Sequence, residues 1–215
     1  MQKPPFEVIK ELEGWTLFWA RLELVSGGGA QLAALRSEVV RKIWARLTME
    51  SLAGHPTVNA LRKLFRAAGC DPTRYRPSSE ALLRRVLKGE ELPALHPLVD
   101  INNCLSADLA VPCCVMREGT FTPPLVFRAG REGESYESLR GPFNPAGKPL
   151  LTDALGALDA PITGNERVKI VPETEIAWLV AYLPEQAVTA ESARDALLQL
   201  LEAAPVARAS QFSAS

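Results

Sequence analysis

The feature that most constrains the fold of this chain is a change in sequence periodicity near Pro112. Apolar side chains recur at helical spacing between residues 31 and 110, whereas short apolar runs alternate with Gly-, Pro- and Asn-rich turns after Pro112. Two strand-like segments, residues 6–9 and 15–25, precede the helices, and a helical segment, residues 190–204, follows the turn-rich part. Strands, then helices, then strands predict an α+β fold with helices packed on a mixed or antiparallel sheet.

The length of 215 residues is enough for one domain with a substantial core. We expect residues 1–204 to form this single domain, with a basic helical insertion at about residues 56–89. Residues 205–215 are small and polar, and we expect them to form a disordered tail.

Positive charge is concentrated in the predicted insertion. Residues 56–89 contain eight Lys or Arg and two Asp or Glu, a net charge of +6, whereas the remainder carries −7. A basic face on an otherwise acidic chain is typical of a protein that binds a polyanion, although solvated helix faces rich in arginine are the alternative. The candidate RNA-binding residues are Arg62, Lys63, Arg66, Arg74, Arg76, Arg84, Arg85 and Lys88.

Composition indicates a cytoplasmic protein with no membrane partner. The longest uncharged apolar run, residues 176–183, is far shorter than the roughly 20 residues that cross a bilayer. The first residues are acidic and contain proline, unlike a signal peptide. Four cysteines without paired spacing indicate reduced thiols.

The segment at residues 98–118, LVDINNCLSADLAVPCCVMRE, combines polar groups with an abrupt helix end. Asp100, Asn102 and Asn103 stand at the start of an apolar helical pattern that Pro112 terminates. Polar side chains at a helix start can line a pocket and exchange hydrogen bonds there. Helix N-capping is the alternative role for Asp100 and Asn103.

This segment resembles the start of the B3/B4 editing module in the beta subunit of bacterial phenylalanyl-tRNA synthetases. Asp100, Asn103 and Pro112 match its spacing, and residues 131–135 (REGES) resemble its basic-Glu-Gly-Glu turn. Three further stretches resemble its later motifs in the same order, at residues 151–153, 164–166 and 172–174. The likeness covers about residues 94–185, and residues 71–93 resemble free-standing members of the family.

The resemblance implies a B3/B4-like fold and hydrolysis of the ester between a wrong amino acid and tRNA. Because the chain shows no synthetic domain, the implied activity is aminoacyl-tRNA deacylation in trans. The implied partner is the aminoacylated 3′ end of tRNA, with an aminoacyl-tRNA synthetase as a further candidate partner. No cofactor and no metal are expected, since the histidines and cysteines lack zinc-ligand spacing.

The pocket residues of the family carry over unevenly. The pocket glycine corresponds to Gly164, whereas the pocket histidine corresponds to Cys114 and the pocket glutamate to Val180. The two polar groups that read a tyrosine hydroxyl in the family are therefore replaced here. Without such a readout the resemblance implies a drier pocket, for which an apolar or small amino acid is favoured over tyrosine.

An activated ester needs only a positioned water and a stabilised oxyanion. Backbone N–H groups near Gly164 and Asn165 are candidates for the oxyanion contact, and Asn102 and Asn103 for orienting the water or the ribose. Asp100 and Glu166 are the candidate general bases. The vicinal ribose hydroxyl of the substrate is an alternative base, and a surface ion pair with Arg167 or Lys169 is the alternative for Glu166.

Two other functions remain open from the sequence. A non-catalytic module that binds tRNA, RNA or an amino acid fits the missing histidine and glutamate, and hydrolysis of another amide or ester is a third hypothesis. Cys114 as a nucleophile lacks a cationic partner nearby in sequence, so a buried, unreactive thiol is the favoured interpretation.

Overall fold

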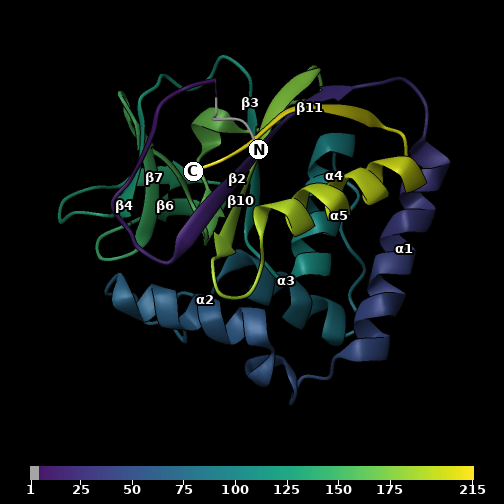
Figure 1. Cartoon of the computed structure of the whole chain (residues 1–215), viewed down its shortest axis with the longest axis horizontal. Coiled ribbons are helices and arrows are strands. Elements are labelled where there is room, and N and C mark those ends of the chain that lie inside the picture. The colour runs from purple at the N-terminus through teal and green to yellow at the C-terminus, as the bar shows by residue number, and fades with distance from the viewer. Residues whose placement is uncertain (1–4) are drawn as a thin grey trace.

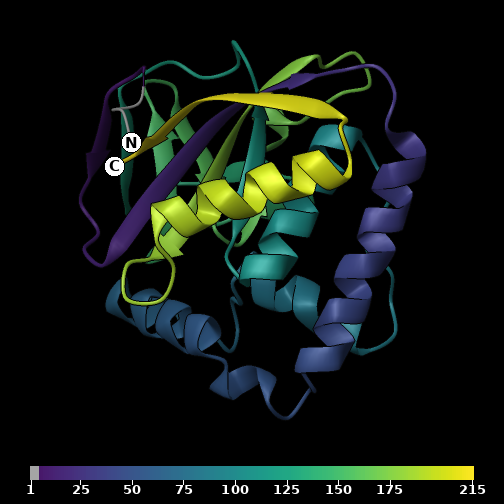
Figure 2. The ribbon, with the colours of Figure 1, turned by 45° about the vertical axis from the view of Figure 1, so that its right-hand side comes forward.

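The computed structural model describes residues 5–215, which form three layers (Figures 1 and 2). The middle layer is an antiparallel sheet with the strand order β11-β2-β10-β3. A second sheet, β1-β4-β7-β8-β9, lies on one face of it, and it is mixed because β1 runs parallel to β4. Helices cover the other face, so the α+β class and the mixed or antiparallel sheets predicted from the sequence are confirmed.

The elements have the following bounds. The middle sheet consists of β2 (Trp15–Leu24), β3 (Cys113–Arg117), β10 (Ile176–Pro184) and β11 (Ala207–Ala214). The second sheet consists of β1 (Val8–Lys10), β4 (Leu125–Ala129), β7 (Pro149–Asp153), β8 (Gly156–Ala160) and β9 (Thr163–Gly164). A separate hairpin joins β5 (Tyr136–Ser138) and β6 (Gly141–Phe143). The helices are α1 (Gly29–Arg46), α2 (Pro56–Ala67), α3 (Ser78–Leu87), α4 (Pro97–Leu109) and α5 (Ala190–Ala203), with short 3₁₀ turns η1 (Leu52–Gly54) and η2 (Glu166–Val168).

Strand β2 shows why the chain forms two cores. Side chains alternate between the faces of a strand. Phe18, Ala20 and Leu22 therefore enter the core beneath the helices, whereas Leu17 and Trp19 enter the core between the two sheets. Both faces are buried, which accounts for the nearly continuous apolar sequence of this strand.

Helix α4 is the central helix and contacts α1, α3, α5, β2, β3 and β10. Its first turn contains Pro97, and its N-cap is His96, whose Nδ1 accepts the Leu98 N–H at 3.3 Å. Neither Asp100 nor Asn103 is therefore the N-cap of this helix. Among residues 5–215, every helix is too short or too polar to cross a bilayer.

The expectation of a disordered tail at residues 205–215 is wrong. Residues 207–214 form β11, which pairs antiparallel with β2 from Ala207 opposite Leu24 to Ala214 opposite Phe18, with a register shift between Ser210 and Ser213. The tail lacks apolar periodicity, but its backbone groups satisfy the open edge of β2, and Ser213 is buried there. Backbone pairing leaves little trace in side-chain pattern, which is why the sequence did not reveal this strand.

Candidate functional site

A cavity of about 680 Å³ opens between α3, α4, β3 and the β8–β9 hairpin. Its walls come from segments that are far apart in the sequence, including the β5–β6 turn, the segment after β9 and one residue of β10. Most of the lining side chains are apolar, with a few convergent polar groups. That composition is typical of a small-molecule or cofactor site.

Five of the residues expected at the site from the sequence line this cavity. Asn102 and Asn103 come from α4, Cys114 from β3, and Gly164 and Asn165 from the end of β9. The fold thus brings together two segments that are separated by more than forty residues and that the same resemblance had singled out.

The other three expected residues lie outside the cavity wall. Asp100 is buried beneath the helix start, where its Oδ2 accepts Arg36 Nη1 at 2.6 Å and its Oδ1 accepts the Leu95 N–H at 2.9 Å. Glu166 pairs with Lys169 at 3.1 Å on the surface. Val180 is fully buried in the core between the sheets, although it is the strand partner of Cys114.

Asn102 offers an unused acceptor to the cavity. Its Nδ2 lies 3.4 Å from the Cys113 carbonyl oxygen and 3.5 Å from Asn103 Oδ1. Its own Oδ1 is buried and has no hydrogen-bond partner among residues 5–215. A buried acceptor is costly when it is left unpaired, so this group favours a bound donor.

The cavity floor is more polar than the resemblance implied. Asp159 of β8 and Tyr182 of β10 both line it, and the Tyr182 hydroxyl donates to Asp159 Oδ2 at 2.5 Å. Asp159 is 1% exposed and Tyr182 is fully buried. The second carboxylate oxygen, Oδ1, has no hydrogen-bond partner in the described part of the chain.

Burial raises the pKa of Asp159 to about 7, and the Tyr182 hydroxyl and the nearby Cys114 thiol oppose this rise only in part. A buried carboxyl group that titrates near neutral pH in a cleft is a candidate functional group. Neither Asp159 nor Tyr182 was expected at the site from the sequence. The available signal was an ionisable residue inside an otherwise apolar strand, ahead of Pro161.

The thiols of Cys113 and Cys114 stay protonated at neutral pH and are therefore poor nucleophiles. Burial raises the pKa of Cys114 well above its usual value, and the negative charge of Asp159 adds to the shift. Burial also raises the pKa of the neighbouring Cys113. Since the thiolate is the nucleophilic form, the geometry favours the interpretation of Cys114 as a wall residue.

Gly164 lies where a side chain would reach the cavity floor. A Cβ atom at this position would stand 3.5 Å from Asp159 Oδ1, 3.5 Å from Leu139 Cδ1 and 3.8 Å from Cys114 Sγ. These are ordinary contact distances, so the methyl group of alanine fits but removes free space. Glycine therefore keeps the floor open next to the carboxyl group.

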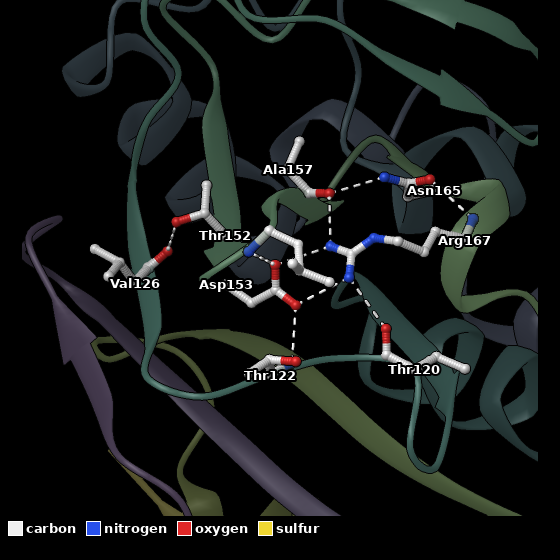
Figure 3. A network of polar contacts seen from close by, with 9 residues as sticks. Thr120, Thr122, Val126, Thr152, Asp153, Ala157, Asn165 and Arg167 are labelled. Atoms are coloured by element: carbon white, nitrogen blue, oxygen red, sulfur yellow. Dashed lines mark hydrogen bonds and ion pairs between the residues drawn. The ribbon is translucent and has the colours of Figure 1, made fainter.

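An ion pair between Arg167 and the buried Asp153 links the segments around the β8–β9 hairpin (Figure 3). Arg167 makes two hydrogen bonds of 2.9 Å to the carboxylate of Asp153, whose side chain is fully buried. The same guanidinium donates to the carbonyl oxygens of Thr120 and Ala157, and Asn165 Nδ2 donates to Ala157 at 2.8 Å. The network joins β7, β8, η2 and the loop before β4 into one rigid unit.

Cationic side chains border the cavity and extend along α2 and α3. Arg85, Arg140 and Lys169 line the cavity and are exposed. Lys63, Arg66, Arg74 and Lys88 are exposed and make no ion pair within residues 5–215.

Three of the expected RNA-binding arginines instead surround one buried carboxylate. Arg62 and Arg84 bind Glu80 at 2.6 and 3.0 Å, and Arg76 stands 3.9 Å away. The Glu80 side chain is fully buried and needs this positive charge, and Arg62 thereby links α2 to α3. Arg85 pairs with Glu90 at 2.8 Å.

Within residues 5–215, no three His, Cys, Asp or Glu side chains gather in an arrangement that could hold a metal ion. The histidines are His55, in the loop before α2, and His96, the cap of α4, which lines the cavity. Burial lowers the pKa of both imidazoles.

Comparison with known proteins identifies the family. The chain aligns over its full length with 51% of an N-terminal fragment of the phenylalanyl-tRNA synthetase beta subunit from Pyrococcus horikoshii, at 12% identity and a TM-score of 0.45, and so spans about half of that chain. No curated protein matches the sequence. The family model of the B3/4 domain matches residues 60–203, more than half of the chain and the whole segment that forms the cavity. The chain therefore belongs to the B3/4 domain family.

Proposed function

We propose that this protein hydrolyses the ester bond of a mischarged aminoacyl-tRNA, acting in trans as a free-standing deacylase in the cytoplasm. The observation that carries the proposal is the single cavity in which Asn102, Asn103, Cys114 and Gly164 meet. These residues come from the segments that resemble the editing module. They line the same cavity as Asp159, the ionisable group on its floor.

Size and charge support this substrate class. A volume of about 680 Å³ lies within the usual range for ligand sites and leaves room for an amino acid and part of a terminal nucleoside. The amino acid enters toward Asp159 and Gly164, while Arg85, Arg140 and Lys169 at the exposed side meet the phosphates of the 3′ end. Asn102 and Asn103 hold the terminal ribose or the attacking water.

The wall also suggests which amino acid is accepted. Val99 and Cys114 give the substrate side chain an apolar surface, and Cys114 provides no strong hydrogen-bonding group for a phenol. A small or apolar amino acid is therefore the proposed substrate, in preference to tyrosine. Because Asp159 Oδ1 on the floor could accept a phenol hydroxyl, rapid release from tyrosyl-tRNA would contradict this preference.

A panel of tRNAs charged with non-cognate amino acids tests the proposal. The protein is incubated with each member, and the release of free amino acid is followed against spontaneous hydrolysis. Release confined to one or two pairs supports the proposal. Tight tRNA binding with no release in the whole panel contradicts it and supports a non-catalytic RNA-binding module.

A further inference from the structure

The floor of the cavity presents one unsatisfied anionic group. Asp159 Oδ2 is held by the Tyr182 hydroxyl at 2.5 Å, whereas Oδ1 has no partner in hydrogen-bond geometry among residues 5–215, and the nearby Cys114 thiol is at most a weak donor to this carboxyl. The residue is 1% exposed and lines the cavity. The oxygen is buried at the cavity floor, and leaving it unpaired is costly, so it favours a donor from a molecule bound next to it.

This oxygen lies beside the glycine hairpin. A Cβ at Gly164 would be 3.5 Å from Oδ1, so a molecule resting on Gly164 comes within reach of the carboxylate. Asn102 Oδ1, a second acceptor with no partner in the described residues, lines the same cavity.

The titratable side chains that face Asp159 are uncharged near pH 7. Tyr182 faces it from β10, Cys114 from β3 and Tyr136 from β5, and burial raises the pKa of each of these groups. The cationic side chains of the cavity, Arg85, Arg140 and Lys169, are exposed rather than buried at the floor. Burial therefore dominates the ionisation of Asp159, and it raises the pKa of this carboxyl to about 7.

We propose that Asp159 is the general base of the deacylation, an inference that rests on the function proposed above. Oδ1 takes a proton from water while the water oxygen bonds to the ester carbonyl carbon. The bond from that carbon to the ribose oxygen then breaks, and the ribose oxygen receives the proton from Asp159. The products are the free amino acid and tRNA with its terminal hydroxyl restored.

Tyr182 is a positioning residue in this scheme. Its hydroxyl fixes Oδ2, and so directs Oδ1 toward Gly164. Its hydrogen bond also lowers the pKa of Asp159 and keeps part of the carboxyl ionised at neutral pH. A base whose pKa lies near the working pH combines sufficient ionisation with sufficient basicity.

The first test compares Asp159→Asn with wild type on one aminoacyl-tRNA that wild type hydrolyses, with exposed Asp195→Asn as matched control. We expect release to fall by about 10²-fold or more in Asp159→Asn, which is the usual contribution of a general base, and to be unchanged in the control.

The wild-type rate, corrected for spontaneous hydrolysis, is expected to rise with pH to a plateau with its midpoint near 7. Tyr182→Phe moves this midpoint upward, because the bond that lowers the carboxyl pKa is lost. An Asp159→Asn rate and pH profile equal to those of wild type would overturn the proposal.

A second test separates a base from a binding group. If Asp159 bound the α-ammonium of the substrate instead, Asp159→Asn would slow release from aminoacyl-tRNA but not from its N-acetylated form, and the proposal would be wrong. If Asp159 is the general base, Asp159→Asn slows release from both substrates by the same factor.

A third measurement does not depend on activity. Carboxyl ¹³C NMR is expected to show Asp159 titrating near pH 7, and a normal aspartate value would overturn the inference even if deacylation is observed. A wild-type protein that releases nothing from the panel contradicts the deacylase function itself, whatever the titration shows.

Discussion

At the scale of single residues, the buried carboxyl of Asp159 lowers the stability of the fold at the pH where it would act as a base. Its carboxyl is buried beside Tyr182 with one oxygen unpaired, and burial raises its pKa to about 7. An unfolded aspartate ionises near pH 3.8, so between these two values the folded chain retains a proton that the unfolded chain releases. The unfolding free energy consequently falls as pH rises from about 4 to about 7.

This linkage predicts that Asp159→Asn stabilises the protein at alkaline pH. The amide removes the buried charge and keeps an acceptor for Tyr182, so the unfolding free energy should increase by up to about 4 kcal/mol at pH 8. The difference should shrink toward pH 5, where the wild-type carboxyl is protonated. Urea denaturation of both proteins at the two pH values measures it. A stability difference that is the same at both values would show that the carboxyl does not titrate there.

The sequence identified the pocket residues that belong to recognisable motifs. Asn103, Cys114 and Gly164 were found because their spacing resembles a known module, and Asn102 because it stands at the start of a helix; all four line one cavity. Asp159 was missed because a charged residue in a short strand has no distinctive spacing. Asp100 was selected for its place at a helix start, but Arg36 lies more than sixty residues away, and no local pattern indicates that partner.

At the scale of elements, the Asp153–Arg167 pair determines where the glycine hairpin stands (Figure 3). Burial acts to raise the pKa of Asp153, but Arg167 and the Thr122 and Leu155 N–H groups outweigh it, and the pKa is lowered. The pair therefore stabilises the fold at neutral pH, and this contribution is lost as pH falls through the lowered value.

Replacing Arg167 with methionine should leave a buried carboxylate without its cation. Breaking a buried pair in this way costs about 3–5 kcal/mol, and the two backbone N–H bonds to Asp153 place the expected loss near the lower end. Thermal or urea unfolding measures the loss, with exposed Arg208→Met as control. A change no larger than that of the control would mean that the hairpin does not depend on this network.

Helices were predicted more accurately than strands. The helices lie where helical spacing was expected, four of them within about residues 29–109 and the fifth at residues 190–203, because each buries one continuous face. Strands β5, β6, β8, β9 and β11 were not predicted. The first four are only two to five residues long, which is too short for a recognisable alternation, and β11 depends on pairing with β2, which is distant in sequence. The β8–β9 hairpin that carries Asp159 and Gly164 belongs to this group, so much of the site geometry depended on the structure.

At the scale of the whole molecule, the basic residues of the predicted RNA-binding set include two kinds, those that pair with a buried carboxylate and those that are exposed without an ion pair among residues 5–215. Arg62 and Arg84 neutralise the buried Glu80, whereas Lys63 and Arg66 are exposed on α2 and make no ion pair within residues 5–215. Reversing an arginine of the first kind would disturb the packing of α2 and α3 as well as any RNA contact. A clean test of RNA binding therefore requires residues of the second kind.

The double variant Lys63→Glu/Arg66→Glu should weaken tRNA binding while the unfolding temperature stays close to that of wild type. Each phosphate contact that is lost should reduce the slope of log K against log salt by about 0.7 to 0.9, since fewer counterions are released. Filter binding or fluorescence anisotropy at several salt concentrations measures affinity and slope together. Arg194→Glu/Arg208→Glu, a reversal of equal size at exposed sites outside residues 56–89, separates a local contact from the effect of net charge. If both variants lose affinity equally, the protein attracts tRNA through its overall charge, and the face formed by α2 is not the docking surface.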